Sequence, residues 1–328
     1  MNTLLKVDFA DFPQEPCQIS LEPCGFSKWC ETFRIDVVLV SGTTESFFLK
    51  VQNGNAYGRM MQGTFASESV FHQYIPSHVP RPIAWGNYAS KPERWFYLSA
   101  FHGFEDKTPG VHSVVSIVTQ FHDASRGKSP TGKFGFHVPT HLGNVPSNNG
   151  WEASWETWFA KAMVRIMEIE EATHGRSKEI DSMKDALFKK VIPRLLRPLE
   201  THGRSVTPTL IHSDIHTDNI RYDASTGQTM LFDSCAFWGH TEAELATWRS
   251  ERYQMGRAYI DEYVKRMGVS EPIEDFDDRN KLYWLRYEFL SSVLHAYNLV
   301  GRQRAVKQMR ELVLKYPEGY TEDESNDK

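Results

Sequence analysis

The sequence has only four cysteines and no long apolar run. The cysteines lack paired C-x-x-C spacing and are too sparse for a secreted disulfide scaffold, so we expect thiols in a reducing compartment. A membrane helix needs about 18 or more consecutive apolar residues, and no window reaches that length. The first residues carry acids and lack a basic segment followed by an apolar one, so no signal peptide or presequence is predicted. A cytoplasmic protein with no membrane partner is therefore expected.

The chain also lacks an excess of one charge. It has 37 Lys and Arg against 42 Asp and Glu, a net charge of −5, so nothing in the overall charge favours nucleic acid as a partner. Hydrophobic residues make up 40% and aromatic residues 13% of the 328 residues, which is enough for a sizeable core. This length suggests two domains or two lobes. The expected partner is a small molecule or another protein.

The first hundred residues are rich in short β-branched and aromatic runs. Residues 33–40, 46–51 and 95–100 are bounded by turn residues and predict strands. Between the second and third runs, residues 60–75 have apolar side chains at helical spacing and end before Pro76. The pattern predicts a small sheet crossed by one helix.

From residue 111 onward the pattern becomes helical. The expected helices are 111–124, 155–173, 182–195, 241–265 and 279–316. Short strands are expected within 210–222 and at 230–233, separated by a turn at 223–228, and residues 126–150 are expected to form a long surface loop. The sequence therefore predicts an α+β protein with one part at 1–102 and a mainly helical part at 103–328.

The densest polar cluster is LIHSDIHTDNI, which is followed by an LFD segment. In a phosphotransferase, an Asp accepts the proton of the attacking hydroxyl, an Asn five residues later binds magnesium, and an Asp after the next strand binds magnesium at the ATP phosphates. Asp214, Asn219 and Asp233 have these types in this order. The same segment also contains His-x-Asp-x-His, a pattern suited to zinc or iron in a metal-dependent hydrolase.

A kinase needs further groups, and the N-terminal part offers them. Lys50 ends a predicted strand and could bind the ATP phosphates, and Glu68 on the following helix could hold that lysine. Upstream, Gly25 permits a tight turn and Ser27 could offer donors to phosphate. The hydrolase interpretation explains none of these residues.

The sequence as a whole resembles the fructosamine kinase (ketosamine-3-kinase) family, which is related to the aminoglycoside phosphotransferases. Three segments carry the resemblance: IHSDIHTDN resembles His-Gly-Asp-Leu-Trp-x-Gly-Asn, KFGFHVPTHLGNVP resembles a Lys-Phe-Gly-Phe-His segment, and FDSCAFWGHTEAELA resembles Asp-Pro-Ala-x-Tyr-Gly-His-x-Glu-x-Glu-Leu-Ala. The resemblance implies a protein-kinase-like fold with a small antiparallel-sheet N-lobe of five strands and a helical C-lobe. It also implies ATP and Mg²⁺ as cofactors, and phosphorylation of the 3-hydroxyl of ketosamines such as fructosamine or ribulosamine adducts of amines or protein lysines.

Carried over by position, the resemblance implies a role for each site residue. Asp214 would be the catalytic base, Asn219 and Asp233 the magnesium ligands, and Lys50 the phosphate-binding lysine held by Glu68. The further expected contacts are the adenine hinge from Leu98 to Phe101, and His216, His240 and Glu242 at the substrate.

Several positions depart from the family pattern. Its Gly after the loop His is Ser213, its Trp is His216 and its second Gly is Asp218. None of these changes removes a phosphoryl-transfer group, but they alter the expected sugar site. Two alternatives stay open: a kinase of the same fold acting on another hydroxyl compound, such as an antibiotic or a biosynthetic intermediate, and a non-catalytic ATP-binding protein. A monomer is the expected oligomeric state.

Overall fold

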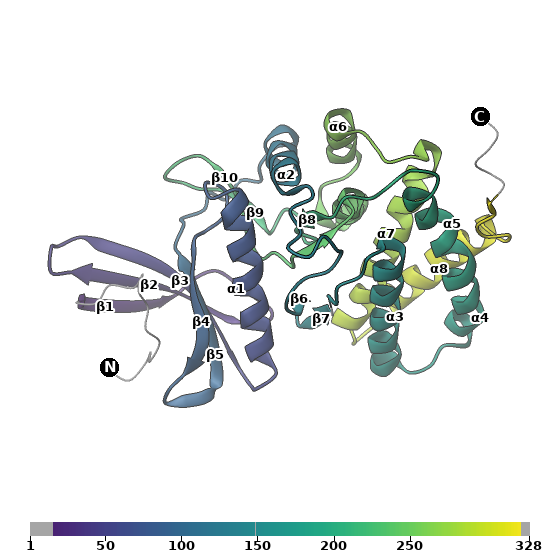
Figure 1. The fold of residues 1–328 in the computed structure, drawn as a ribbon. Coiled ribbons are helices and arrows are strands. Elements are labelled where there is room, and N and C mark those ends of the chain that lie inside the picture. The colour runs from purple at the N-terminus through teal and green to yellow at the C-terminus, as the bar shows by residue number, and fades with distance from the viewer. Residues whose placement is uncertain (1–15, 148, 323–328) are drawn as a thin grey trace.

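The computed structural model describes residues 16–147 and 149–322 (Figure 1). Within them, the N-terminal part is a five-stranded antiparallel sheet with strand order β1-β2-β3-β5-β4. Its strands are β1 (Pro16–Pro23), β2 (Glu31–Leu39), β3 (Thr44–Asn53), β4 (Pro82–Tyr88) and β5 (Lys91–Ala100). Helix α1 (Tyr57–Tyr74) connects β3 to β4 and lies between the sheet and the helical part of the chain (Figure 1). The predicted sheet with one crossing helix is confirmed.

Alternation along β3 divides the sheet into two faces. Phe47, Leu49 and Val51 are buried in a hydrophobic cluster on one face. Side chains in a strand alternate between faces, so Phe48 and Lys50 point to the other side. Both of them line a cavity there. The hydrophobic pattern of this one strand therefore fixes which side of the sheet carries polar chemistry.

The two outer strands, β1 and β4, were not predicted from the sequence. Each pairs with a single neighbour at an edge of the sheet. In β1, Ile19 and Leu21 are 40% and 48% exposed, so the strand has no buried face to produce a clear alternating pattern. The formation of such edge strands depends more on hydrogen bonding to the neighbouring strand than on their own residue pattern.

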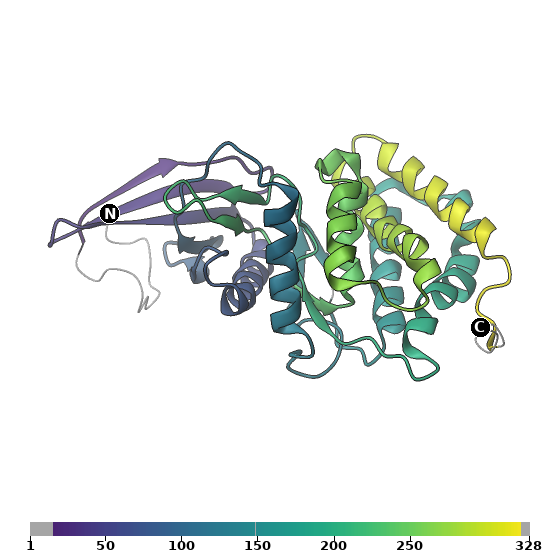
Figure 2. The same ribbon diagram turned by 90° about the horizontal axis from the view of Figure 1, so that it is seen from above.

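The helical part begins after β5. Its elements are α2 (Val111–Ser125), β6 (Thr140–Leu142), β7 (Val145–Ser147), α3 (Trp155–His174), α4 (Lys178–Ala186), the π-helix η1 (Leu187–Val191), α5 (Ile192–Leu196), η2 (Arg197–Glu200), β8 (Thr209–Ile211), β9 (Ile220–Tyr222), β10 (Thr229–Leu231), β11 (Phe237–Gly239), the 3₁₀ helices η3 (Thr241–Arg249), η4 (Glu251–Tyr253) and η5 (Ile273–Asp275), α6 (Arg257–Met267), α7 (Phe276–Leu294) and α8 (Val300–Lys315). Viewed from above, the sheet and the helices form two adjacent masses (Figure 2). No helix in the described ranges is long and apolar enough to cross a membrane.

The prediction of a long surface loop at residues 126–150 is wrong. The segment contains the β6–β7 hairpin, and Phe134 and Phe136 are 2% and 4% exposed within the core of the helical part. Phe134 and Gly135 also form bridges to Glu152 and Trp238. The many Gly, Pro and Asn residues gave the sequence a loop-like composition, but its aromatic residues are packed inside.

Three predicted helices are divided in the structure. Residues 241–265 form η3, η4 and α6, with Gly256 at φ +80° before α6, a conformation that favours glycine. Residues 279–316 lie in two helices, α7 and α8, and residues 182–195 run through α4, η1 and α5. Apolar spacing alone did not reveal these breaks because the apolar residues continue across them.

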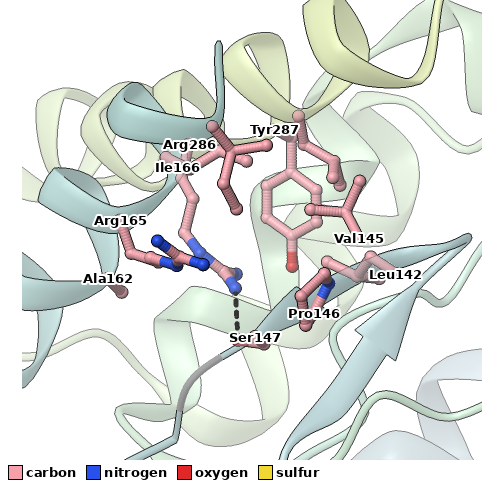
Figure 3. A pocket seen from close by; sticks show the side chains of 11 residues that line it. Leu142, Val145, Pro146, Ser147, Ala162, Arg165, Ile166, Arg286 and Tyr287 are labelled. Carbon is pink, nitrogen blue, oxygen red and sulfur yellow. Dashed lines mark hydrogen bonds between the residues drawn. The ribbon is translucent and has the colours of Figure 1, made fainter. Parts of the chain in front are cut away.

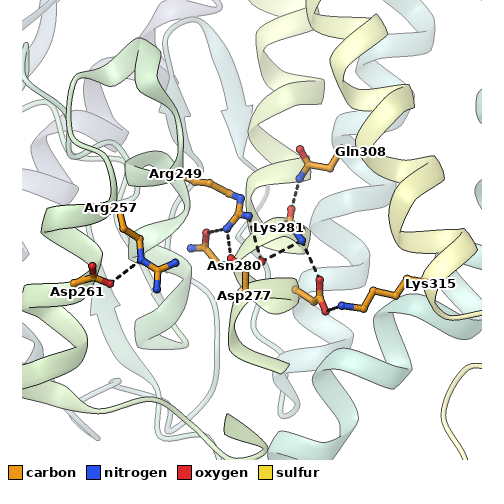
Figure 4. Close-up of polar contacts among 9 residues, drawn as sticks. Arg249, Arg257, Asp261, Asp277, Asn280, Lys281, Gln308 and Lys315 are labelled. Carbon is orange, nitrogen blue, oxygen red and sulfur yellow. Dashed lines mark hydrogen bonds and ion pairs between the residues drawn. The ribbon is translucent and has the colours of Figure 1, made fainter. Parts of the chain in front are cut away.

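The core of the helical part is built around aromatic residues of α3. Trp155, Trp158 and Phe159 are nearly fully buried, and Trp155 and Trp158 stack with ring centroids 5.1 Å apart. Their helical spacing places them together on the face of α3 that packs into this core. Polar contacts join the surrounding helices: Arg249 of η3 donates to Asp277 and to Asn280 of α7 at 2.7 Å and 3.1 Å (Figure 4).

Candidate active site

A cavity with a volume of about 440 Å³ lies between the sheet and the helical part. Its walls come from segments far apart in the sequence: the β1–β2 loop, β3, α1, β5 and the segment from β9 to Asp233. The cavity brings together these predicted site residues: Gly25, Ser27, Lys50, Glu68, Phe101, Asn219 and Asp233. Among the other residues that line it are His102 and Arg221, which the sequence analysis did not predict, and Asp218, which stands where the family pattern has glycine. Arg221 lies in strand β9, directly after the loop that carries Asn219.

The loop between β1 and β2 forms one wall of this cavity. Gly25 has φ +74°, which favours glycine, and the N–H of Cys24 donates to the carbonyl of Thr32 at 3.0 Å to close the loop. The Ser27 hydroxyl oxygen accepts hydrogen bonds from the backbone N–H groups of Trp29 and Cys30, each at 3.2 Å. The Ser27 side chain therefore shapes the loop from within.

Lys50 reaches from β3 into the cavity and forms an ion pair with Asp233. Burial lowers the pKa of the Lys50 ammonium, and the nearby charges of Cys30 and Glu68 oppose that shift. Glu68 itself is 3% exposed, and its Oε1 accepts from the backbone N–H and the hydroxyl of Ser234, each at 2.8 Å. In this structure Lys50 thus pairs with Asp233 rather than with the predicted partner Glu68, which instead anchors the residue that follows Asp233.

The predicted hinge residues face opposite ways. Leu98 is 1% exposed and packs in the hydrophobic cluster of the sheet, so its side chain does not reach the cavity. Tyr97 and Ser99 line the cavity, as alternation along β5 requires, and Phe101 lines it just after the strand ends. The hinge from Leu98 to Phe101 was expected to act through backbone groups, so the orientation of the Leu98 side chain does not decide that prediction.

The segment after β8 carries Asp214 at the edge of the helical part. Asn219 donates from Nδ2 to the Asp214 carbonyl at 2.9 Å and to its Oδ2 at 3.0 Å, which joins two of the predicted catalytic residues directly. Ser213, immediately before Asp214, has φ +64° and donates its hydroxyl to the carbonyl of Cys235 at 2.9 Å. The Asp214 side chain is 23% exposed, so its carboxylate can be reached from outside.

The comparisons with known proteins agree with this geometry. The sequence model of the fructosamine kinase family matches residues 32–315. The chain belongs to the fructosamine kinase family. A mouse ketosamine-3-kinase is 35% identical over 115 residues, 35% of this chain and 34% of that enzyme, so this match spans about a third of the mouse enzyme. A chloroplastic protein-ribulosamine 3-kinase of Oryza sativa is 26% identical over 258 residues, 78% of this chain and 68% of that enzyme.

Solved structures show the same fold at low identity. A Thermobifida fusca protein described as a candidate fructosamine-3-kinase has a TM-score of 0.67 and 16% identity, covering 90% of this chain and 93% of that one. The aminoglycoside phosphotransferase APH(4)-Ia, solved with AMP-PNP and hygromycin B, has a TM-score of 0.60 and 15% identity, covering 90% of this chain and 93% of that one. The predicted α+β fold with a kinase-like arrangement is confirmed.

His216, where the family pattern has Trp, lies beside the Asp214 carboxylate. Its Nε2 is 3.7 Å from Asp214 Oδ1, and its Nδ1 is 3.9 Å from Asp218 Oδ2. The His216 ring stacks on the Tyr253 ring with centroids 4.8 Å apart. The guanidinium carbon of Arg252 lies over the Tyr253 ring, 4.9 Å from its centroid. Burial, followed by the Asp214 charge, raises the pKa of Tyr253 to about 12. No sequence signal pointed to Tyr253, because it falls in a segment that was predicted to be one helix.

The expectation that His240 and Glu242 contact the substrate is corrected by the structure. His240 is 3% exposed and its ring nitrogens bond to Tyr283 and Ser270 at 2.8 Å and 2.9 Å. Glu242 is 2% exposed and forms a two-bond ion pair with Arg279, at 2.8 Å and 3.0 Å. Both side chains are paired with groups inside the helical part, and neither lines the large cavity. The family-like spacing of this segment reflects internal packing.

The transition-metal interpretation of His-x-Asp-x-His requires all three side chains to converge; His216 lies beside Asp214, but the His212 ring packs elsewhere. His212 is 1% exposed and its ring lies against Phe71, with centroids 5.3 Å apart. Its Nδ1 accepts from the backbone N–H of Asp214 at 3.3 Å. Within residues 16–147 and 149–322, no group of three or more His, Cys, Asp or Glu side chains is arranged to hold a metal ion. His212 is a structural residue of the loop.

A second, much smaller cavity of about 20 Å³ lies between β6–β7, α3 and α7 (Figure 3). Arg286 donates to the Ser147 hydroxyl at 3.0 Å across it, and the Tyr287 hydroxyl donates to the Ser213 carbonyl at 2.6 Å. This volume holds about one water molecule. It cannot accept a nucleotide or a sugar, so the larger cavity is the candidate site.

Proposed function

We propose that this protein is an ATP-dependent kinase that phosphorylates the 3-hydroxyl of ketosamines, such as fructosamine or ribulosamine adducts of amines or protein lysines. One observation carries the proposal: in a member of the fructosamine kinase family, one cavity gathers Lys50, Asn219 and Asp233, and Asn219 bonds directly to Asp214. Residues 1–102 would form the nucleotide-binding lobe and residues 103–328 the lobe that carries the catalytic loop. The cytoplasmic location and the monomeric state stay predictions of the sequence.

The nucleotide would occupy the large cavity, with its adenine toward Phe101 and its phosphates toward Lys50. The N–H groups of Ala100 and Phe101 already donate to the carbonyls of Arg81 and Ser46, at 2.8 Å and 3.1 Å. Backbone recognition of adenine would therefore fall to the residues that follow, beginning with His102. Lys50 is held in a half-buried position where its charge would act on phosphate oxygens.

In the transfer step, the acceptor hydroxyl oxygen forms a bond to the γ-phosphorus while the bond from that phosphorus to the ADP oxygen breaks. Asp214 receives the hydroxyl proton, and Asn219 holds the Asp214 carboxylate at Oδ2. Asn219 and Asp233 offer the amide and carboxylate oxygens that Mg²⁺ prefers, and they line the same cavity, so these residues fit the ion. Bound there, Mg²⁺ would neutralise charge on the ATP phosphates.

The identity of the acceptor depends on the side of the catalytic loop where His216 stacks on Tyr253. His216 stands where the family pattern has an apolar Trp, and its Nδ1 is 3.9 Å from Oδ2 of Asp218, which stands where that pattern has Gly. A second candidate is therefore a kinase of the same fold that acts on another hydroxyl compound. The presence of the kinase-fold residues favours phosphoryl transfer in both cases.

The test is mass spectrometry of fructosyl-lysine and ribulosyl-lysine after incubation with the protein, ATP and Mg²⁺. We expect one added phosphoryl group with the wild type and none with Asp214→Asn. Thermal stabilisation by ATP and Mg²⁺ should persist in that variant, because Asp214 does not line the nucleotide cavity. Equal phosphorylation by both proteins would refute the role of Asp214. Stabilisation without phosphorylation by the wild type would favour another acceptor.

A further inference from the structure

Helix α7 carries an arginine that is buried without a carboxylate partner. Arg286 is 9% exposed and lines the small cavity between β6–β7, α3 and α7 (Figure 3). One of its N–H groups donates to the Ser147 hydroxyl at 3.0 Å, and it forms no ion pair with any Asp or Glu side chain that the structure describes. A buried cation is costly unless an opposite charge lies against it. The charge of Arg286 is therefore not offset by any described part of the chain.

Two other arginines of the helical part show the usual arrangement. Arg279 is 0% exposed and binds both oxygens of Glu242, as described above. Arg302 is largely buried and binds both oxygens of Glu170 at 2.6 Å and 2.8 Å. In each pair, a carboxylate accepts two parallel hydrogen bonds and balances the charge. Arg286 has the cavity where these arginines have a carboxylate.

The walls of the cavity add a second positive charge and a largely apolar surface. Arg165 of α3 also lines the cavity, and no Asp or Glu is among the described residues around it. The ion pair of Arg165 with Glu168 lies on the surface, at 3.5 Å between two exposed side chains. The apolar lining consists of Leu142, Val145, Ala162, Ile166, Ile169 and Leu290. Two cations beside an apolar cavity favour a bound anion, because charges attract strongly where water is excluded.

The hydroxyl groups at the cavity are already engaged. The Ser147 hydroxyl accepts from Arg286 and donates to Asn149 Oδ1 at 2.9 Å, and the Tyr287 hydroxyl donates to the Ser213 carbonyl. The donors left for a bound group are therefore guanidinium N–H groups. A guanidinium is more weakly hydrated than an ammonium, and with apolar walls it suits an anion that gives up its own water readily.

The size of the cavity restricts the anion to a single atom. A volume of about 20 Å³ accepts one water-sized particle, whereas a carboxylate or a phosphate needs more room. A chloride ion is only slightly larger than a water molecule, and the exposed Arg165 side chain can move to admit it. Water could fill the same space, but it would leave the charge of Arg286 uncompensated.

We propose that this cavity is a chloride site, with Arg286 as its principal ligand and Arg165 as the second. The cavity shares no lining residue with the nucleotide cavity, so the proposal does not depend on the kinase function. An anion that binds the folded chain and not the unfolded one stabilises the fold in a saturable way. Chloride is therefore a stabilising ligand of the helical part.

The experiment measures the thermal unfolding midpoint of the full chain while sodium gluconate is replaced stepwise by sodium chloride at constant ionic strength. We expect a saturable rise of about 2 °C in the wild type. Bromide should act as well as chloride, and the strongly hydrated fluoride should not. Arg286→Met removes the charge but keeps a long side chain, so the rise should disappear.

Arg257→Met is the matched control for the loss of one positive charge. Arg257 is an exposed arginine of α6 that pairs with Asp261 at 2.7 Å, and it does not line the cavity. This variant should keep the full response to chloride. Equal rises in the wild type, Arg286→Met and Arg257→Met would reveal a general salt effect and overturn the proposal, as would no rise in the wild type.

A further variant covers the case in which Arg286→Met fails to fold. Arg165 is exposed, so Arg165→Met should fold, and we expect it to raise the chloride concentration at half-maximal stabilisation several-fold. An unchanged half-maximal concentration would refute the site built from two arginines.

Bromide provides a readout that does not depend on stability. Crystals grown with sodium bromide should show an anomalous peak beside the Arg286 guanidinium in the wild type, and none there in Arg286→Met. Density for water alone would overturn the proposal. A bromide peak without any chloride-dependent midpoint would mean binding at crystal concentration only, and it would refute a chloride site in solution.

Discussion

Ser213 offers a sharp test of the backbone geometry that precedes Asp214. The residue has φ +64°, where a non-glycine residue costs about 1–2 kcal/mol, and its hydroxyl bond to the Cys235 carbonyl recovers about 1 kcal/mol. The family pattern has glycine at this position. Ser213→Ala removes the hydrogen bond and keeps the unfavourable conformation, so it should destabilise the protein by about 1–2 kcal/mol.

Ser213→Gly loses the same hydrogen bond but relieves the left-handed conformation. Part of that gain is offset by about 0.4–1 kcal/mol of extra backbone entropy in the unfolded chain. The glycine variant should therefore be more stable than the alanine variant by about 1 kcal/mol. Because neither variant has the hydroxyl, this difference isolates the backbone conformation.

The assay is guanidinium unfolding followed by tryptophan fluorescence, with midpoints and slopes compared between variants. Ser182 is a matched control, since it is an exposed serine inside helix α4. There the order should reverse, with alanine more stable than glycine by about 1 kcal/mol. An alanine variant at Ser213 as stable as the glycine variant would refute the argument.

Three further predictions concern the site and the core. Lys50→Met should lower kcat by on the order of 100-fold, because a buried cation beside the phosphates is lost; steady-state kinetics with wild-type efficiency would contradict it. Asn219→Ala should raise the Mg²⁺ concentration needed for half-maximal activity, measured by Mg²⁺ titration at saturating ATP, and an unchanged titration would remove Asn219 as a ligand. Burial lowers the pKa of His240 to about 4 from 6.5, so the unfolded chain binds the proton more tightly, and stability falls as the pH drops from 6.5 toward 4, by about 3 kcal/mol. Unfolding midpoints at pH 7.5 and 4.5 should differ less in His240→Gln than in the wild type, and equal differences would count against this assignment.

Three polar residues of the large cavity, Lys50, Asn219 and Asp233, were predictable because each carries its own chemical signal. Lys50 ends an apolar strand, and Asp214, Asn219 and Asp233 have the order that phosphoryl transfer requires. Phe101 followed from its place in the hinge. The predicted partner of Lys50 was wrong for this structure, because sequence order cannot reveal that Glu68 bonds to Ser234 while Asp233 pairs with Lys50.

The acceptor side was harder to predict. His240 and Glu242 resemble family residues by position, but whether a polar side chain faces a cavity or an internal partner depends on groups distant in the chain, here Tyr283 and Arg279. The contact of Tyr253 with His216 could not be predicted, because residues 241–265 were expected to form one helix and instead form η3, η4 and α6. Loop-like composition at residues 126–150 likewise concealed a buried hairpin.

By itself the sequence determined the α+β class, the alternation that turns Lys50 away from the hydrophobic face of β3, and the set of groups needed for phosphoryl transfer. These follow from local periodicity and from residue chemistry, which act over a few neighbouring positions. The tertiary structure alone decided the ion-pair partners, the burial of Glu242, and the hydrogen bonds that Glu244 accepts from the backbone N–H groups of His212 and Ser213. Such contacts join residues about 30 to 180 positions apart, and their free energy depends on exclusion of water by the whole packed core.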